Sequence, residues 1–383
     1  MSTFVVSARK YRPSSFDEVL GQEQVTNTLK NAIQNDQLAH AFLFTGPRGV
    51  GKTSTARILA KVLNCEDRKE KGTIACGVCS SCKAMEDNGS FNIIELDAAS
   101  NNSVEHMRML NEQVRFRPQE GQYKIFIIDE VHMLSNASFN AFLKTLEEPP
   151  EYAIFILATT EKHKILPTIL SRCQLFDFRR IPISEIVKQL KLIAEKEKIK
   201  IDEDAMHLIA QKSDGAMRDS LSIFDKITST FKGKIGYKEV ATSLNLLDYD
   251  YFFKAIDSLV QEDLTGIYLL YDEIVRNGFD ADAFVQGLTA HLRDILMTKS
   301  PETLELIQTS DEQKKRYKDQ SKLCSQSFLI SALNLLTQTA INLPRANNQH
   351  LMVEVALAKI AYINRQIEEG SDQKKNSISQ VPV

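Results

Sequence analysis

One short run of residues restricts the possible folds of this chain more than any other. Residues 46–53 satisfy every fixed position of the pattern G-x-x-x-x-G-K-[ST]. The apolar stretch 40–44 before the run predicts a short strand, and the stretch 54–63 after it predicts a helix, because its apolar residues recur at helical spacing. A strand, a glycine-rich loop and a helix in this order are typical of a phosphate-binding loop.

The residues of this loop have separate tasks in holding a polyphosphate. Backbone N–H groups of the loop and of the helix start can point at the anion, and the helix dipole adds partial positive charge. We expect Lys52 to reach the β- and γ-phosphates and the Thr53 hydroxyl to bind Mg²⁺. The nucleotide contacts predicted from this segment are Gly46, Pro47, Arg48, Gly49, Val50, Gly51, Lys52, Thr53 and Ser54.

Length, charge and hydropathy exclude several classes of protein. A chain of 383 residues, of which 43% are hydrophobic, can form two or three domains with ordinary cores. Its formal net charge of −3 excludes a basic field over the whole molecule, so any contact with nucleic acid must come from local patches. The sequence lacks the ~18-residue apolar run of a membrane span and the layout of a signal peptide. We therefore expect a cytoplasmic protein.

Four of the six cysteines lie close together after the predicted phosphate-loop helix, at Cys65, Cys76, Cys79 and Cys82. In a cytoplasmic protein this spacing favours metal binding over disulfides. Four thiolates with no histidine among them are the ligand set of a closed structural zinc site. An iron–sulfur cluster is the rival interpretation, although the Cys-Pro step of the bacterial ferredoxin motif is missing. Unligated thiols are the third.

Further strands are predicted by apolar stretches at 91–97, 123–128, 153–158 and 175–178. The second of these contains the continuous apolar run 125–128, as in a strand buried on both faces of a parallel sheet, and Asp129 and Glu130 follow it directly. Carboxylates at the carboxyl ends of such strands lie where open α/β sheets bind ligands. We expect Asp129 to hold Mg²⁺ and Glu130 to polarise the water that attacks the γ-phosphate.

Other polar residues near the strand ends give weaker signals. Thr160 follows the strand predicted at 153–158, where a hydroxyl can sense the γ-phosphate or the attacking water. Arg172 follows a short helix, and packing does not explain an exposed arginine there. We interpret His132 as a structural histidine, with metal binding as the alternative.

At this point the chain resembles a known family, the gamma/tau subunits of bacterial DNA polymerase III, which are the AAA+ ATPases of the sliding-clamp loader. The matching stretches are residues 11–13, 16–22, 46–53, 129–132, 143–150, 158–160 and 171–173, together with the four cysteines. A phosphate loop and a four-cysteine module in one AAA+ domain are much more selective together than either is alone.

This resemblance implies roles that the spacing does not show. Arg172 would be an arginine finger that reaches the ATP of a neighbouring subunit, and Thr160 would be the first sensor. Arg218 would be a second sensor, which contacts the γ-phosphate from the lid. An arginine finger of this kind accelerates hydrolysis by a factor of about 10³–10⁵.

The polar N-terminal segment has the composition of a linker. The family resemblance instead implies a nucleotide-binding role, in which Tyr11, Arg12 and Val19 line the adenine side of the pocket.

The domain organisation follows from the helical patterns and the resemblance. We expect an α/β fold, with an AAA+ P-loop NTPase domain at 1–180 built on a parallel sheet and carrying the zinc module at 65–82. A helical lid at 181–243 and an all-α collar or oligomerisation domain at 244–369 would follow, and the polar composition of 370–383 predicts a disordered tail.

In the last helical region, Leu351, Val355 and Ile360 are expected on the core face of one helix.

The resemblance implies an ATPase motor subunit of the DNA polymerase III holoenzyme that loads the sliding clamp onto primed DNA. Its cofactors would be ATP, Mg²⁺ and Zn²⁺. Its partners would be other loader subunits of delta and delta-prime type, the sliding clamp and primer–template DNA, with no membrane contact. Candidates for DNA contact are Arg108 and Lys144, because Asn101, Asn102 and Ser103 stand where the family often has basic residues.

Two other functions remain open on the residues alone. A generic AAA+ motor that remodels or translocates nucleic acid or protein would use the same ATP site. A scaffold that does not hydrolyse ATP would not need Lys52, Asp129 and Glu130, and their presence argues against it.

Overall fold

The structure is a computed structural model, and it describes residues 5–68, 72–86, 90–118, 121–231, 233–244, 247–307, 309, 311–363 and 365. The tail predicted at 370–383 lies outside these residues. The chain divides into two compact units. The first, called the sheet unit, comprises Met1–Ile193 and Ile209–Lys226, and the second, called the helical unit, comprises Ala194–Leu208 and Ile227–Val383. Among the described helices, none has the length and apolar character needed to cross a membrane.

A five-stranded sheet organises the sheet unit, and its strands follow the order β2-β3-β4-β1-β5 with every pair parallel. The strands are β1 (Ala41–Thr45), β2 (Ile93–Asp97), β3 (Lys124–Asp129), β4 (Ala153–Thr159) and β5 (Gln174–Asp177). The expected parallel α/β fold is thus confirmed. Because all carboxyl ends meet at one edge, the polar residues that follow β1, β3 and β4 share that edge.

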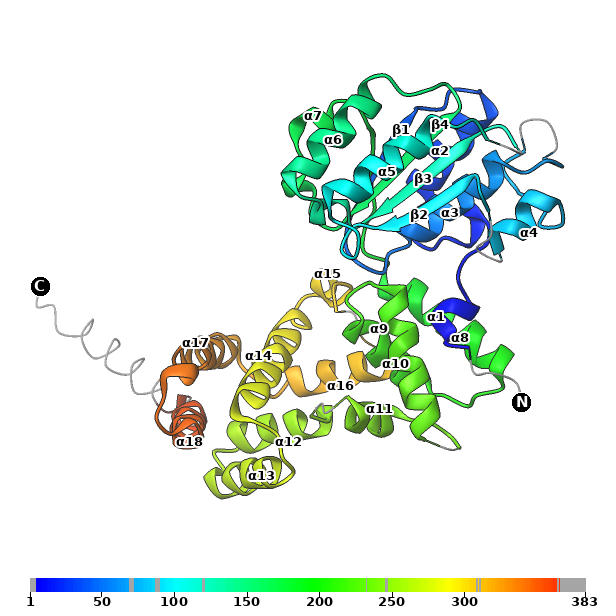
Figure 1. Cartoon of the computed structure of the whole chain (residues 1–383). Helices are drawn as coiled ribbons and strands as arrows, with labels where there is room; N and C mark the ends of the chain where they lie inside the picture. Colours follow the sequence, from blue (N-terminus) through cyan, green and yellow to red (C-terminus); the bar gives the residue numbers. More distant parts are fainter. Residues whose placement is uncertain are drawn as a thin grey trace, which may run out of the picture. The chain divides into compact units, whose positions relative to one another are not determined.

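Helices cover both faces of this sheet (Figure 1). Helices α2 (Glu23–Gln34) and α3 (Lys52–Leu63) pack on one face. The other face is covered by α5 (Val104–Val114), α6 (Asn136–Glu147) and α7 (Pro167–Leu170). The central residues of β1, β3 and β4 are apolar, which allows both faces of these strands to be buried under helices.

One predicted strand begins later than its apolar sequence indicated. Phe91 was expected to open the strand at 91–97, but β2 begins at Ile93 and the Phe91 side chain is 80% exposed. The pairing of β2 with β3 starts at Ile93 opposite Ile125. Phe91 therefore precedes the ladder and has no facing strand to pack against.

Three helices lie in the region expected to form the lid, α8 (Ile183–Glu197), α9 (Glu203–Lys212) and α10 (Met217–Thr230). Two shorter helices, α1 (Ser7–Lys10) and α4 (Ser80–Glu86), lie earlier in the chain. The two compact units do not divide the chain at 181 or 244. The proposed domain boundaries therefore stay predictions.

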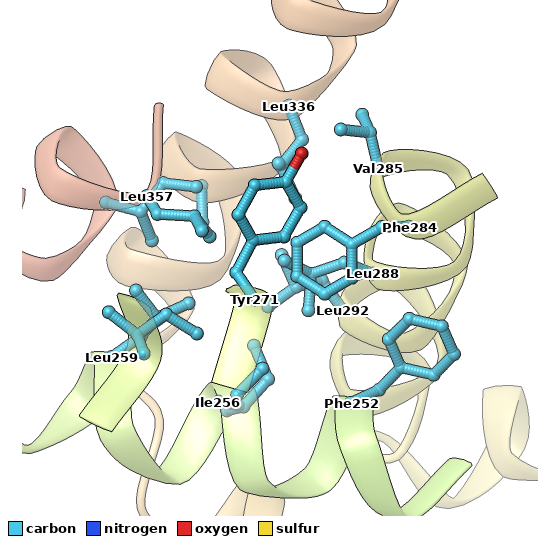
Figure 2. Packing of buried hydrophobic residues seen from close by; sticks show 14 of the residues in the cluster. Phe252, Ile256, Leu259, Tyr271, Phe284, Val285, Leu288, Leu292, Leu336 and Leu357 are labelled. Carbon is cyan, nitrogen blue, oxygen red and sulfur yellow. The ribbon is translucent and has the colours of Figure 1, made fainter. Parts of the chain in front are cut away.

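The helical unit contains α11 (Tyr237–Ser243), α12 (Tyr249–Val260), α13 (Leu264–Arg276), α14 (Ala281–Met297), α15 (Pro301–Leu304), α16 (Asp311–Ser321), α17 (Gln326–Asn342) and α18 (Gln349–Ala361). Helices α12, α13, α14, α17 and α18 begin after a polar side chain that accepts a backbone N–H of the first turn, which is the usual way to satisfy a helix start. Figure 2 shows their shared core, in which Tyr271 of α13 lies against Phe284 of α14 with ring centroids 5.1 Å apart.

The predicted core face of α18 is wrong in part. Ile360 is fully buried, whereas Leu351 is 54% exposed and Val355 is 45% exposed. A step of nine residues turns a helix by about 180°, so Leu351 and Ile360 lie on opposite sides. The buried side is formed by Val353, Ala356, Leu357, Ile360 and Ala361. A helix that is apolar on most sides does not reveal its core face by spacing alone.

Candidate nucleotide site

The phosphate-loop glycines occupy positions that no larger residue could take. Gly46 has a φ of 143°, and a Cβ there would lie 2.4 Å from the carbonyl oxygen of Phe178. A Cβ on Gly49 would lie 2.9 Å from the Cβ of Ala216, just before α10. The loop is therefore packed against the backbone of Phe178 at Gly46 and against the side chain of Ala216 at Gly49.

Lys52 is the first residue of α3, and its side chain curls back over the loop. Its Nζ donates to the carbonyl oxygens of Gly46 and Pro47 at 2.7 Å each. Burial lowers the pKa of Lys52, and the carboxylates of Glu130 and Asp129 oppose that shift. The ammonium group is thus held inside the loop, where a polyphosphate would lie.

Thr53 and Asp129 come from different segments and meet at the sheet edge. The Thr53 hydroxyl donates to Oδ2 of Asp129 at 2.6 Å, and Oδ1 of Asp129 accepts the backbone N–H of Glu130 at 2.9 Å. A hydroxyl and a carboxylate side by side supply the hard oxygen ligands that Mg²⁺ prefers. This donor set fits the predicted magnesium site.

Glu130 follows β3 in a conformation that a non-glycine residue rarely adopts, with a φ of 48° and a ψ of 44°. Its Oε2 accepts a hydrogen bond from the Thr160 hydroxyl at 3.1 Å. The structure therefore brings together the base and the sensor expected from the sequence, because β3 and β4 are neighbours in the sheet.

A cavity of about 570 Å³ opens beside Thr53 and Asp129. Arg12 and Arg218 line it, as do Arg57 and Glu95. Burial, with the nearby charge of Arg57 opposed by that of Glu95, lowers the pKa of Arg12. Several guanidinium groups beside the magnesium position favour a highly charged anion there.

Two of these lining residues were missed in the sequence. Arg57 forms an ion pair with Glu95 at 2.5 Å, between α3 and β2. The available signal was helical spacing, because Arg57 lies four residues after Thr53 and so shares its face of α3. Glu95 gave no signal, because its place depends on which strand lies next to β3.

The N-terminal segment reaches the site from outside the sheet. Val19 is buried, and a Cβ on Gly51 would lie 3.3 Å from its Cγ1. Arg12 lies in the cavity beside Thr53 and Asp129, and Tyr11 is half-buried. Val19 thus adjoins the loop, while the adenine side of the pocket stays a prediction for all three residues.

The lid helix α10 begins directly on the loop. The backbone N–H of Arg218 points at the carbonyl oxygen of Gly49 at 3.5 Å, and the Arg218 side chain lines the cavity. A residue 165 positions after Thr53 in the chain therefore reaches the same cavity. This position is compatible with a sensor role, which itself remains a prediction.

Arg172 lies apart from the residues that line the cavity. It is exposed between α7 and β5, and its Nη2 contacts Oε1 of Glu147 at 2.7 Å while its Nη1 donates to the carbonyl oxygen of Thr168 at 2.7 Å. Within the described chain, these contacts orient the guanidinium along the surface. Arg108 and Lys144 are also exposed, and their predicted contact with DNA stays untested.

The four cysteines converge as their spacing predicted. The sulfur atoms of Cys65, Cys76, Cys79 and Cys82 all lie within 4.8 Å of one another. The Cys76 sulfur accepts backbone N–H groups from Val78 and Cys79 at 3.4 and 3.3 Å, and these bonds lower the pKa of Cys76 to about 7. Four converging sulfurs with N–H donors around them fit a tetrahedral thiolate site.

Three family models match consecutive parts of the chain. Residues 21–182 match "DNA polymerase III, delta subunit", and residues 185–228 match "DNA polymerase III clamp loader subunit, ATPase lid domain". Residues 235–375 match "DNA polymerase III subunits gamma and tau domain III". Together, these matches extend over most of the sequence.

Curated relatives agree with these models. The chain is 38% identical to DNA polymerase III subunit tau of Bacillus subtilis over 94% of its own length and 63% of the relative. It is 40% identical to DNA polymerase III subunit tau of Escherichia coli over 79% of its own length and 47% of the relative. The chain therefore spans about half to two thirds of the length of these relatives.

Among solved structures, the RuvB Holliday junction branch migration motor of Thermotoga maritima is 21% identical with a TM-score of 0.46, covering 65% of this chain and 79% of that one.

Proposed function

The chain belongs to the DNA polymerase III gamma/tau family, and from that premise we propose that it is an ATP-hydrolysing motor subunit of a clamp loader. ATP binding and hydrolysis would drive the loading of a sliding clamp onto primed DNA. The observation that carries the proposal is the hydrogen bond between Thr53 and Asp129, beside the buried Lys52 and directly before Glu130. One edge of the sheet thus presents residues for binding Mg-ATP and for activating water.

Each residue at this edge has a task that its position supports. The loop backbone and Lys52 would bind the β- and γ-phosphates, and Thr53 and Asp129 would hold Mg²⁺, which neutralises charge as the γ-phosphate leaves. Glu130 would accept a proton from the attacking water, with its carboxylate fixed by Thr160. The cavity arginines Arg12 and Arg218 would enclose the triphosphate.

Arg172 would act on a neighbouring subunit. It is exposed, it contacts Glu147 of α6, and it does not line the cavity among the described residues. An arginine in this position can serve a site only if another subunit presents that site. Hydrolysis would therefore depend on assembly.

We assign the four-cysteine module a structural Zn²⁺. The converging sulfurs offer four ligands and no open position, which favours a structural role over a catalytic one. Elemental analysis should give about one zinc per chain, and the metal should contribute folding free energy on the order of 10 kcal/mol. Iron in the elemental analysis would instead indicate an iron–sulfur cluster. The cytoplasmic location expected from the sequence, where thiols stay reduced, is part of the same proposal.

The helical unit would join the chain to other loader subunits. Helices α17 and α18 expose large apolar side chains, Ile330 and Ile341 on the first and Leu351 and Val355 on the second. Exposed apolar residues on adjacent helices are typical of a surface that another protein covers. Ile341→Glu should lower the assembled mass in sedimentation, whereas the matched change Leu192→Glu, on the exposed face of α8, should not.

The decisive experiment measures ATP hydrolysis with and without a sliding clamp, primed DNA and the partner subunits. Strong stimulation by the complete mixture is expected, because the Arg172 of one subunit then reaches the site of the next. Basal hydrolysis that this mixture does not change would favour the generic AAA+ motor instead. No ATP binding at all would reject both.

Glu130→Gln tests the hydrolytic assignment directly. The variant should bind ATP as tightly as the natural chain, because its fold and loop are unchanged, and should turn over about 10²–10⁴-fold more slowly. The matched change Glu23→Gln, at the exposed start of α2, should leave turnover unaffected. Normal turnover in Glu130→Gln would remove Glu130 from the mechanism.

A further inference from the structure

His132 has no role in the site as described so far, although it lies at the centre of its edge. It belongs to the short helix η2 (Val131–Met133), which follows Glu130, and its side chain is only 9% exposed. A buried histidine is often no more than a packed core residue. The contacts of its two ring nitrogens therefore decide whether His132 only packs in the core or also serves the site.

Both ring nitrogens of His132 face polar groups of the catalytic edge. Nδ1 lies 3.1 Å from the Thr159 hydroxyl and 3.5 Å from Oε2 of Glu130. Nε2 points to the other side, 3.9 Å from Oε2 of Glu161, which is beyond a direct hydrogen bond. The Nδ1 side is thus the side that meets the proposed base.

The partner of Nδ1 is itself fixed. The Thr159 hydroxyl accepts the backbone N–H of Glu161 at 3.0 Å, at the carboxyl end of β4. Glu161 also forms an ion pair with Lys164, three residues further along. The imidazole is therefore anchored to the end of a buried strand and cannot rotate freely.

Glu130 needs such support. Its backbone has a positive φ, a conformation that persists only where the surroundings hold it. Its Oε2 receives the hydrogen bond from Thr160 and faces Nδ1 of His132. Both contacts fall on one oxygen, so Oε1 is the oxygen left to meet the attacking water.

We propose that His132 is a positioning residue for Glu130, and that its Nδ1, together with the Thr160 hydroxyl, holds Oε2 of Glu130 so that Oε1 points toward the γ-phosphate. This inference rests on the proposed ATPase function. His132 would touch neither ATP nor the attacking water. It would act only through the orientation of the carboxylate.

Two amide substitutions separate this role from plain packing. The side-chain nitrogen of Asn can take the place of Nδ1, whereas that of Gln takes the place of Nε2. His132→Asn should therefore retain most of kcat, while His132→Gln and His132→Ala should lower kcat about 10–100-fold, because a misplaced base loses about that much. The KM for ATP should stay unchanged in all three variants, since His132 touches no nucleotide.

The measurements are steady-state ATP hydrolysis in the complete loader mixture, ATPγS affinity, and thermal unfolding of each variant. Combining His132→Ala with Thr160→Val should cost less than the product of the two separate losses, because both residues hold the same oxygen. Equal losses in the Asn and Gln variants, or a parallel rise in KM, would leave His132 as a packing residue only. The proposed function fails separately, if the natural chain itself neither binds nor hydrolyses ATP.

Discussion

Polar side chains of the sheet unit meet one another at the ends of strands, whereas one helix of the helical unit contains a buried histidine and a half-buried aspartate. Lys52, Thr53 and Asp129 contact or approach one another at an edge open to a cavity. In the helical unit, His291 of α14 is fully buried against Gln320, and its Nδ1 has no hydrogen-bond partner among the described residues. Asp294 lies one turn further along the same helix.

The pKa values show what these surroundings do to a charge. Burial lowers the pKa of His291 to about 4, and burial raises the pKa of Asp294 to about 6. Both shifts favour the neutral form. The sheet edge instead keeps opposite charges close together, at Lys52 and the carboxylates of Asp129 and Glu130. Burial lowers the pKa of Lys52 as well, but these two carboxylates oppose the shift, so opposite charges accompany burial at the sheet edge.

Among the substitutions that test this comparison, Lys52→Ala should have the largest effect. It removes the buried ammonium group that we expect to bind two phosphates, and charged hydrogen bonds of this kind contribute about 1.5–3 kcal/mol each. Affinity for a fluorescent ATP analogue should fall about 10³-fold, and turnover should be lost with it. Lys83→Ala on α4 is the exposed control. Tight ATP binding by Lys52→Ala would refute the phosphate-loop assignment.

Arg172→Ala comes next, and it tests whether an exposed charge finds its partner outside the chain. In the assembled loader, hydrolysis should slow by about 10³–10⁵, because the finger of each neighbour is missing. In the isolated chain, nucleotide affinity and basal hydrolysis should stay unchanged. A comparable loss in the isolated chain would place Arg172 in its own site and contradict the contact with Glu147.

Asp294→Asn tests whether the half-buried aspartate of the helical unit destabilises the folded chain when it is ionised. The folded pKa of Asp294, about 6, lies above its ordinary value of 3.8, so its ionised form destabilises the folded chain above pH 6. That penalty disappears as the pH falls below both values. The variant should therefore gain about 3 kcal/mol in the free energy of unfolding at pH 8 and almost nothing near pH 3.

Chemical denaturation at the two pH values would measure this difference, and His291 cancels because both proteins contain it. Asp282→Asn, an exposed change on the same helix, is the control. An equal gain at both pH values would mean that the effect does not come from ionisation.

Glu147→Gln should have the smallest effect. It removes an exposed ion pair with Arg172, and such pairs contribute about 0–1 kcal/mol. Stability should hardly change, and hydrolysis in the assembly should stay within about threefold of the natural chain, because Arg172 itself is intact. A loss as large as that of Arg172→Ala would show that Glu147 positions the finger.

Much of the site could be predicted because its signals are local. The phosphate loop, the carboxylates after β3 and the cysteine spacing each occupy a short segment, and each segment has few alternative uses. The position of β2 was less predictable. Phe91 is a residue type that is common in strands. It lies outside the ladder only because the pairing of β2 with β3 begins at Ile93.

The core face of α18 could not be predicted for a different reason. Its sequence is apolar on nearly all sides, so spacing offered several faces and the neighbouring helices selected one. Leu351 and Val355 lie on the other, exposed face, which we propose contacts another loader subunit.

By itself, the sequence predicted the phosphate loop, the acidic pair that follows β3, a metal-binding spacing of four cysteines and, through resemblance, the family. Those features depend on residues that are neighbours in the chain. Only the tertiary structure decided that Arg57 and Glu95 share a cavity with Arg218, and that His132 faces Glu130 and Thr159. These contacts join segments that are brought together by the order of strands in the sheet and by the packing of helices on it, which no single segment encodes.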